Sequence, residues 1–243
     1  MTDLGRTLIA AAERTPRALA VVDGETRFDY AAWIDTAARL AAGLGGLGLG
    51  RGDRLAVIMQ NRWEMAALYW ACQLAGVVVV PLNWRSSAEE LDYFLEDSGA
   101  AALAFDESAA AAVAGSACAA RLRRIGVGDA PGGTVDFGDL LAASAEATPR
   151  AGEDDLSLML YTSGTTGRGK GVPRTHRAER ASALAHIAQN CYRAGERTLG
   201  VMPLYHTMGV RSLLAMVPVG GAFVCQHRFD AAGALRLIEA ERI

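Results

Sequence analysis

The chain has 243 residues, and 51% of them are hydrophobic, so it can build the core of one large domain or of two small ones. Its formal net charge is −3, which argues against a nucleic-acid-binding protein because such proteins are usually basic. No apolar run reaches the length needed to cross a membrane, so no transmembrane segment is expected.

The four cysteines are far apart in the sequence and show neither a CxxC pair nor the spacing of metal ligands. Such thiols are expected to stay reduced, which predicts a cytoplasmic protein. At the N-terminus, residues 1–16 carry charges early and place Leu4, Leu8 and Ile9 at helical spacing. This pattern predicts an amphipathic helix and argues against a signal peptide.

After residue 50, strand-like and helix-like segments alternate, as expected for βαβ units. Residues 54–60 form an apolar run, and residues 63–74 have the spacing of a helix that Gly76 would end. Residues 77–82 are mostly β-branched, which is typical of a central strand in a parallel sheet.

Ser87 and Glu90 form a capping box at the start of the next helix. Residues 102–105 are the following predicted strand, and the alanine-rich residues 108–120 predict a helix after it. The basic cluster at 121–124 is interpreted as the solvated end of this helix.

Residues 126–155 are richer in Gly, Pro and Asp, predict one short helix near 137–144, and are expected to end as a surface linker. Beyond them the alternation resumes. Strands are predicted over 156–161, 198–202 and 222–226, and helices over 175–192, 207–217 and, after a cap at Asp230, 234–243. The whole pattern predicts an α/β fold with layers packed around a largely parallel sheet.

Residues 161–172 read YTSGTTGRGKGV and directly follow a predicted strand. Glycines let backbone N–H groups approach an anion closely, and serine and threonine hydroxyls offer further donors to phosphate oxygens. Lys170 adds a positive charge, and it is the only lysine among the 24 Lys and Arg residues. A solvated surface charge tolerates arginine in place of lysine, whereas a site that needs a compact ammonium group does not, so this lysine indicates a functional loop.

Two other interpretations of the string are a flexible surface turn and the P-loop of an NTPase or kinase. The string matches the Walker spacing up to Lys170, and residues 102–107 imitate a Walker B strand with its aspartate. However, Gly171 offers no hydroxyl to Mg²⁺, and Pro173 interrupts the helix that should start at the lysine. The strand that imitates Walker B also precedes the loop instead of following it, so the P-loop is disfavoured.

The string closely resembles the phosphate loop of the adenylate-forming superfamily, which includes acyl-CoA synthetases, luciferases and peptide-synthetase adenylation domains. That loop typically reads YTSGTTG-x-PKGV, so Gly169 stands where the family usually has proline. The resemblance extends to residues 28–33 and 61–100, and MPLYHTMG at 202–209 is similar to the motif of the acyl pocket. It covers practically the whole chain in the family order.

Members of this superfamily condense a carboxylate with ATP into an acyl-adenylate and then pass the acyl group to a thiol, so the resemblance implies ATP, Mg²⁺ and coenzyme A. The chemistry needs positioned reactants and compensated negative charge more than acid–base catalysis. Lys170 and Thr166 are the implied catalytic residues, and Thr166 is the implied neighbour of Mg²⁺. The residues implied to bind the ATP phosphates are Thr162, Ser163, Gly164, Thr165, Thr166, Gly167 and Lys170.

His206 and Tyr205 are the candidate substrate-binding residues. A lone histidine is more often a structural residue than a catalyst, but PLYH lies where the family lines its acyl pocket. Peptide-synthetase relatives have an aspartate there that pairs with the substrate ammonium. A histidine implies an acid without an α-amino group, either an aryl acid or a medium- or long-chain fatty acid.

The resemblance implies one sheet subdomain over 51–195, which carries the phosphate loop 161–171, and part of a second formed by 1–50 and 196–243. Family members are much longer, so the small C-terminal domain is expected to be absent and this fragment to be inactive alone. The implied partners are a carboxylic acid, ATP and coenzyme A, with a homodimer left open. The alternative is a non-catalytic, truncated interaction module.

Overall fold

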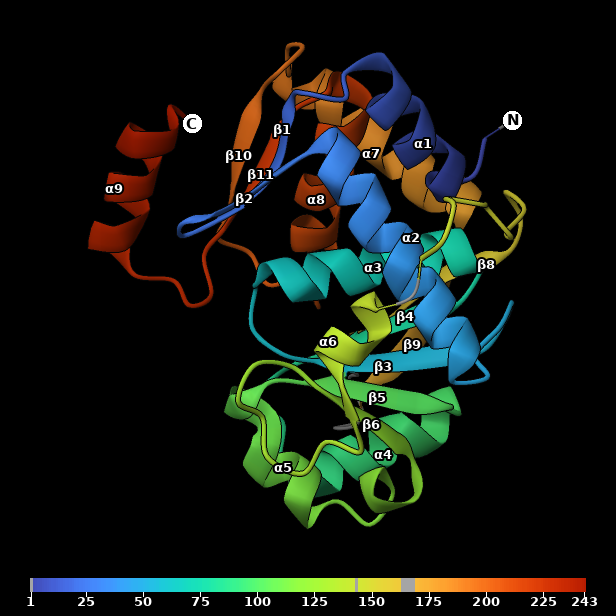
Figure 1. The fold of residues 1–243 in the computed structure, drawn as a ribbon. Coiled ribbons are helices and arrows are strands. Elements are labelled where there is room, and N and C mark those ends of the chain that lie inside the picture. The colour runs from blue at the N-terminus through green and yellow to red at the C-terminus, as the bar shows by residue number, and fades with distance from the viewer. Residues whose placement is uncertain (1, 143, 163–168) are drawn as a thin grey trace.

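The structure of the protein is a computed structural model, and it describes residues 2–142, 144–162 and 169–243 (Figure 1). Within these residues the strands form a seven-stranded sheet in the order β7-β6-β5-β3-β4-β8-β9 and a four-stranded sheet in the order β10-β11-β1-β2. The strands are β1 (Leu19–Asp23), β2 (Thr26–Asp29), β3 (Arg54–Ile58), β4 (Val78–Leu82), β5 (Ala102–Phe105), β6 (Arg123–Gly126), β7 (Val135–Asp136), β8 (Leu156–Thr162), β9 (Lys170–Thr175), β10 (Arg197–Gly200) and β11 (Ala222–Cys225).

Helices pack between and around the two sheets. They are α1 (Leu4–Arg14), α2 (Tyr30–Gly46), α3 (Trp63–Ala75), α4 (Ala88–Ser98), α5 (Ala110–Gly115), α6 (Phe137–Leu141), α7 (His176–Asn190), α8 (Thr207–Val219) and α9 (Ala231–Glu241), with short 3₁₀ turns η1 (Glu107–Ala109) and η2 (Ala119–Arg121). None of these described helices is long and apolar enough to cross a lipid bilayer.

In the larger sheet the strands from β3 to β8 run parallel, and β9 pairs with β8 in the opposite direction. β3 and β4 are paired from Arg54 opposite Val78 to Ile58 opposite Leu82. β4 is buried over its whole length, because hydrophobic clusters cover both faces of the sheet. The predicted α/β fold and its central parallel strand are therefore confirmed.

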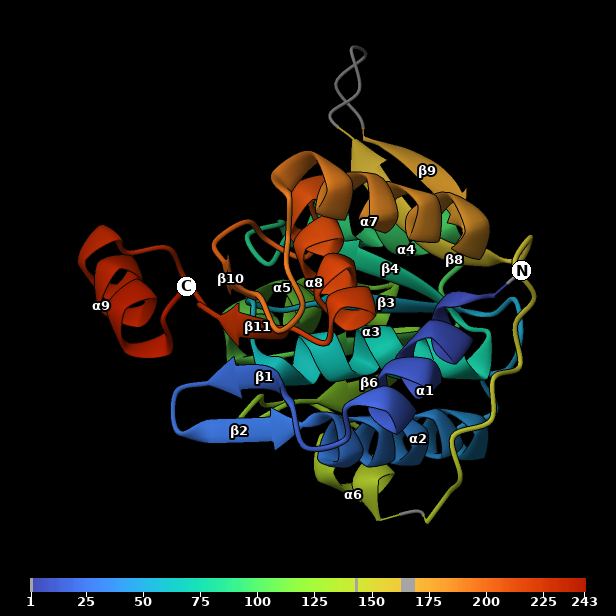
Figure 2. The same cartoon turned by 90° about the horizontal axis from the view of Figure 1, so that it is seen from above.

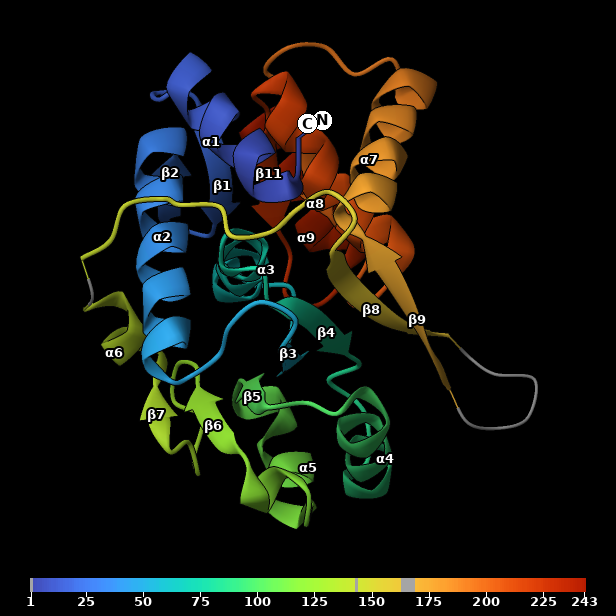
Figure 3. The same cartoon turned by 90° about the vertical axis from the view of Figure 1, so that its right-hand side faces the viewer.

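Helix α3 lies between the two sheets, and Figure 3 shows it almost end-on between β1 and β11 on one side and β3 and β4 on the other. Every residue from Glu64 to Ala75 is buried. Gln73, a polar residue in this helix, is satisfied by β8, because Ser157 Oγ donates to Gln73 Oε1 over 2.7 Å. Gly76 ends the helix in a left-handed conformation, as the sequence predicts.

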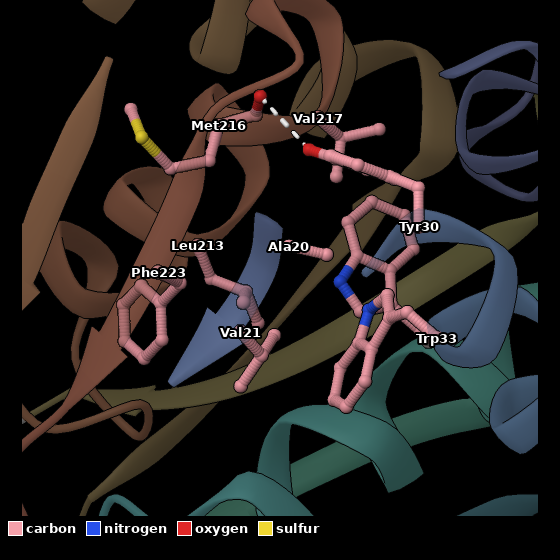
Figure 4. Close-up of a pocket in the computed structure, with 9 residues that line it drawn as sticks. Ala20, Val21, Tyr30, Trp33, Leu213, Met216, Val217 and Phe223 are labelled. Atoms are coloured by element: carbon pink, nitrogen blue, oxygen red, sulfur yellow. Dashed lines mark hydrogen bonds between the residues drawn. The ribbon is translucent and has the colours of Figure 1, made fainter. Parts of the chain in front are cut away.

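The smaller sheet is joined to its helices by a buried tyrosine. Figure 4 shows Tyr30 and Trp33 of α2 against Met216 and Val217 of α8. The Tyr30 hydroxyl donates to the carbonyl oxygens of Met216 at 3.2 Å and Gly221 at 2.8 Å. This contact fixes the end of α8 and the turn into β11, because one hydroxyl bonds to a carbonyl in the last turn of α8 and to a carbonyl just after it.

Helix α1 docks on the start of α7 through a histidine. His176 is the first residue of α7, and it is fully buried. The backbone N–H of Leu4 donates to His176 Nδ1 over 3.3 Å. Burial lowers the pKa of His176, although the nearby carboxylates of Asp3 and Asp155 partly oppose this shift.

Helix α9 lies at the edge of the molecule beside β10, and Figure 2 shows it apart from the other helices. It is tied back by Glu241, which forms ion pairs with Arg27 of β2 and Arg197 of β10. Large apolar side chains remain exposed here, at Phe229, Leu235 and Ile238.

The predicted helix over 108–120 is wrong as a single element. It is interrupted because Ser116 Oγ and the Cys118 backbone N–H both donate to Asp92 of α4, which draws the chain out of the helical path. The interpretation of 121–124 as a solvated helix end holds only for Arg121, which is exposed at the end of η2, because Arg123 and Arg124 begin strand β6. The buried end of β6 pairs with β5 and makes this segment part of the sheet.

The antiparallel edges of both sheets go beyond the sequence predictions. β1 and β2 form a hairpin in the smaller sheet, and β8 and β9 form one in the larger sheet. The segment after Lys170 is therefore a strand, whereas a P-loop requires a helix there.

We expect His176 to make the protein less stable in mild acid. A histidine whose folded-state pKa is lowered takes up a proton in the unfolded state first, so the free energy of unfolding should fall as the pH drops below about 6.5. The variant His176→Gln should flatten this slope in urea titrations at several pH values.

The matched control is His227→Gln. Asp23 raises the pKa of His227, so its stabilisation is present below about 6.5 and is lost as the pH rises through the folded-state value. Removing it should change the pH profile above 6.5 and in the opposite sense. An unchanged slope in His176→Gln would contradict the prediction.

Candidate functional site

A cleft of about 550 Å³ opens at the carboxyl ends of β4 and β8, between α4 and the start of α8. Ligands of parallel α/β sheets bind at this edge, because the carboxyl ends of the strands and the loops that follow them meet there. The described residues that line it are Pro81, Leu82, Asn83, Ser86, Glu90, Phe94, Leu160, Tyr161, Thr162, Gly169, Tyr205, His206 and Thr207.

One wall of the cleft is the hairpin of β8 and β9. Tyr161 pairs with Gly171 and Thr162 pairs with Lys170, so the two arms of the hairpin lie side by side up to the phosphate-loop motif (Figure 3). Of the predicted phosphate-binding residues, Thr162 and Lys170 end these arms. The others, Ser163, Gly164, Thr165, Thr166 and Gly167, lie outside the described residues.

Helix α4 holds both arms of the hairpin. The Tyr93 hydroxyl donates to the carbonyl oxygen of Gly169 over 2.9 Å, and the Tyr161 hydroxyl donates to Asp97 Oδ2 over 2.7 Å. The rings of Phe94 and Tyr161 pack with their centroids 4.6 Å apart. Burial and the bond to Asp97 raise the pKa of Tyr161, so it remains a neutral donor. The hairpin is therefore anchored at its stem.

Lys170 is exposed at the first position of β9. Among the described residues, no carboxylate forms an ion pair with its ammonium group. Lys170 is next to Gly169, which lines the cleft, but is itself not among the described lining residues. Its charge is thus not neutralised by a described neighbour and can meet an anion that extends out of the cleft.

The opposite wall is the start of α8. Tyr205 and His206 line the cleft together, with ring centroids 6.1 Å apart. The His206 backbone N–H donates to the carbonyl oxygen of Pro203 over 2.8 Å, while its ring makes no hydrogen bond to a described residue. The structure therefore brings Thr162, Tyr205 and His206 to one cleft, and the helix N-terminus there favours negative charge.

An arginine of the hairpin wall, which the sequence analysis missed, forms a buried ion pair with α7 and also reaches the start of α8. Arg174 of β9 contacts Glu179 of α7, with Nε and Oε1 2.6 Å apart, and also donates to Thr207 Oγ1 over 3.5 Å. Burial raises the pKa of Glu179, while Arg174 and Arg211 act against this rise. The arginine follows Lys170 by only four positions, but no sequence pattern indicates that its partner is buried.

Replacing Arg174 with methionine should lower the free energy of unfolding by about 3 kcal/mol, because the buried carboxylate of Glu179 loses its charged partner. The double variant Arg174→Met/Glu179→Gln removes that uncompensated charge and should recover most of the loss. The control Arg39→Met breaks an exposed pair with Asp35 and should cost less than about 0.5 kcal/mol. Urea unfolding measures all three, and a stable single variant would contradict the prediction.

Comparisons with known proteins place these observations in a family. Residues 8–243 match the family model described as AMP-binding enzyme. The chain is 35% identical over 241 residues to a feruloyl-CoA synthase from an Amycolatopsis species, covering 99% of this chain and 47% of that protein. It is 31% identical over 253 residues to the long-chain-fatty-acid–CoA ligase FadD13 from Mycobacterium tuberculosis, covering 100% of this chain and 49% of that protein.

A solved structure agrees with the sequence relatives. The inhibitor-bound crystal structure of the N-terminal domain of FACL13 from Mycobacterium tuberculosis matches with a TM-score of 0.91 and 29% identity, covering 100% of this chain and 62% of that one. The chain spans about half the length of the curated relatives it matches. With the family model matched over nearly its whole length, the chain belongs to the AMP-binding enzyme family.

Proposed function

We propose that this chain is the N-terminal part of an enzyme that uses ATP to activate a carboxylic acid and then joins the acyl group to coenzyme A. The observation that supports this best is the cleft, where the hairpin ending at Thr162 and Lys170 faces the segment of Tyr205 and His206. A single cleft offers one end to a polyanion and another to an organic acid. The named relatives, both CoA ligases, support the same reaction class.

The hairpin end of the cleft is proposed to bind ATP. Lys170 would contact the β- and γ-phosphates, and Thr162 would donate its hydroxyl. The ammonium group of Lys170 is exposed and forms no ion pair with a described residue, which supports this assignment. Ser163, Gly164, Thr165, Thr166 and Gly167 complete the proposed loop. Thr166 is proposed to lie near Mg²⁺, which would supply further positive charge to the phosphates when bound.

The α8 end of the cleft is proposed to bind the acid. Next to this end, the cleft is lined by the aromatic rings of Phe94, Tyr161 and Tyr205 and by the apolar side chains of Leu82 and Leu160, which suit an aryl or alkyl group. His206 would lie next to the carboxylate, and the positive end of α8 would favour its charge. We propose an aryl acid or a medium- or long-chain fatty acid.

Formation of the acyl-adenylate needs little acid–base catalysis from these residues. A carboxylate oxygen attacks the α-phosphorus of ATP and pyrophosphate leaves, so the rate depends on alignment and on compensation of the phosphate charge. The cleft aligns the reactants, and Lys170 compensates charge on the leaving pyrophosphate. We further propose that 51–195 and the combination of 1–50 with 196–243 are two subdomains, and that this chain alone forms no acyl-adenylate.

The test is ATP–pyrophosphate exchange by the longest natural protein that contains these residues, with a panel of aryl and aliphatic acids. Lys170→Ala should lower the exchange rate about 100-fold, the size expected when a charge-stabilising group is lost. Lys170→Arg should recover only part of it, because a guanidinium is not a compact point charge. Arg193→Ala removes an exposed charge on the α7–β10 connection and should have no effect.

Exchange that depends on one class of acid would identify the substrate. Exchange with no acid, or full activity in Lys170→Ala, would overturn the proposal. The isolated 243-residue chain should be inactive in the same assay.

A further inference from the structure

The segment that carries Tyr205 and His206 is held by a side chain from the other sheet. Asn61 follows β3 and is buried. Its Nδ2 donates to the carbonyl oxygens of Gly200 at 2.9 Å and Met202 at 2.8 Å. Its Oδ1 accepts the backbone N–H of Leu204 over 2.8 Å. One amide therefore satisfies three backbone groups, at the end of β10 and in the connection from β10 to α8.

This connection also rests directly on α8. A β-carbon added at Gly209 would lie 2.2 Å from the carbonyl oxygen of Pro203 and 2.6 Å from that of Met202, so only glycine fits beneath the segment. Two contacts thus confine the segment: its backbone packs on Gly209 in the first turn of α8, and Asn61 forms hydrogen bonds with it. Tyr205 and His206 directly follow Leu204, the last residue that Asn61 holds.

Asn61 is itself rigidly placed. The backbone N–H of Gln60 donates to Oδ2 of Asp106, which follows β5 of the larger sheet, over 3.0 Å. The backbone N–H of Trp63 donates to Oδ2 of Asp23, the last residue of β1 in the smaller sheet, over 2.9 Å. The turn that carries Asn61 is therefore fixed to both sheets. A side chain on such a turn can hold the segment before α8 at a fixed position relative to the larger sheet.

We infer that Asn61 is a positioning residue, which fixes Tyr205 and His206 at the distance from the hairpin that the acid substrate requires. The inference rests on the proposed function, because it assigns the acid to the Tyr205–His206 wall. Only asparagine offers two donors and an acceptor at this reach: an aspartate would turn two of the three contacts into repulsion with carbonyl oxygens.

The test compares Asn61→Ala with Gln60→Ala in the full protein. Gln60 is the preceding residue, and its side chain makes no hydrogen bond to a described residue. In Asn61→Ala the KM for the acid should rise about tenfold and kcat should fall, while the KM for ATP stays within about twofold. Gln60→Ala should leave all three unchanged. A parallel loss for acid and ATP, or no change, would overturn the inference.

A second readout does not depend on activity. Amide hydrogen exchange at Leu204 should be about tenfold or more faster in Asn61→Ala than in the wild type, while amides in β3 and β4 keep their protection. Unchanged exchange at Leu204 overturns the inference even if the enzyme is active. If Leu204 exchanges faster in Asn61→Ala but the wild-type protein activates no acid, the proposed function is overturned. The role of Asn61 in holding the segment before α8 would still stand.

A second variant, Asn61→Asp, separates the role of the acceptor from that of the donors. The aspartate keeps the acceptor for the Leu204 amide and loses both donors, so Leu204 should keep part of its protection while the KM for the acid still rises. An Asn61→Asp protein with the wild-type KM for the acid would overturn the inference.

Discussion

The complete burial of α3 is the constraint on which the rest of the structure depends. A helix buried on all sides needs apolar residues around its whole circumference and a layer of structure on each side. The larger sheet covers one side, and the smaller sheet with α1, α2 and α8 covers the other, so one hydrophobic cluster extends through both layers. Gln73 is tolerated inside it because Ser157 of β8 completes its hydrogen bonds, which also fixes α3 against the strand that leads to the cleft.

Because α3 fixes the two layers against each other, residues that are distant in the sequence meet at one edge. β4 and β8 end there from the larger sheet, and α8 begins there from the smaller sheet's side. Two buried polar groups fix the elements that form these walls: the Asn61 amide holds the segment before α8, and the Arg174–Glu179 pair holds β9 to α7. Buried polar groups of this kind cost desolvation free energy, so they are best understood as devices that specify one arrangement of the walls.

The sequence predicted the elements whose signals are local. The run at 77–82, the capping box at Ser87 and Glu90 and the stop at Gly76 all depend on neighbouring residues, and the structure contains each of them. Elements whose partners are distant were missed: the strand at 123–126 is specified by its pairing with β5, and β9 by its pairing with β8. Likewise, motif resemblance found Thr162, Tyr205 and His206, which share the cleft, whereas Asn61 and Arg174 act through tertiary contacts that leave no local pattern.

The proline that distinguishes this loop from a P-loop has a further consequence for the molecule's surface. Strand β9 is one of the two edge strands of the seven-stranded sheet, and Val172 and Pro173 within it are exposed. An exposed edge strand is a template on which another chain can add a strand and begin to aggregate. Proline has no backbone N–H to offer such a strand, and Lys170 places a charge at the same edge. The segment that begins at Lys170 thus disfavours the addition of a further strand at this edge of the sheet.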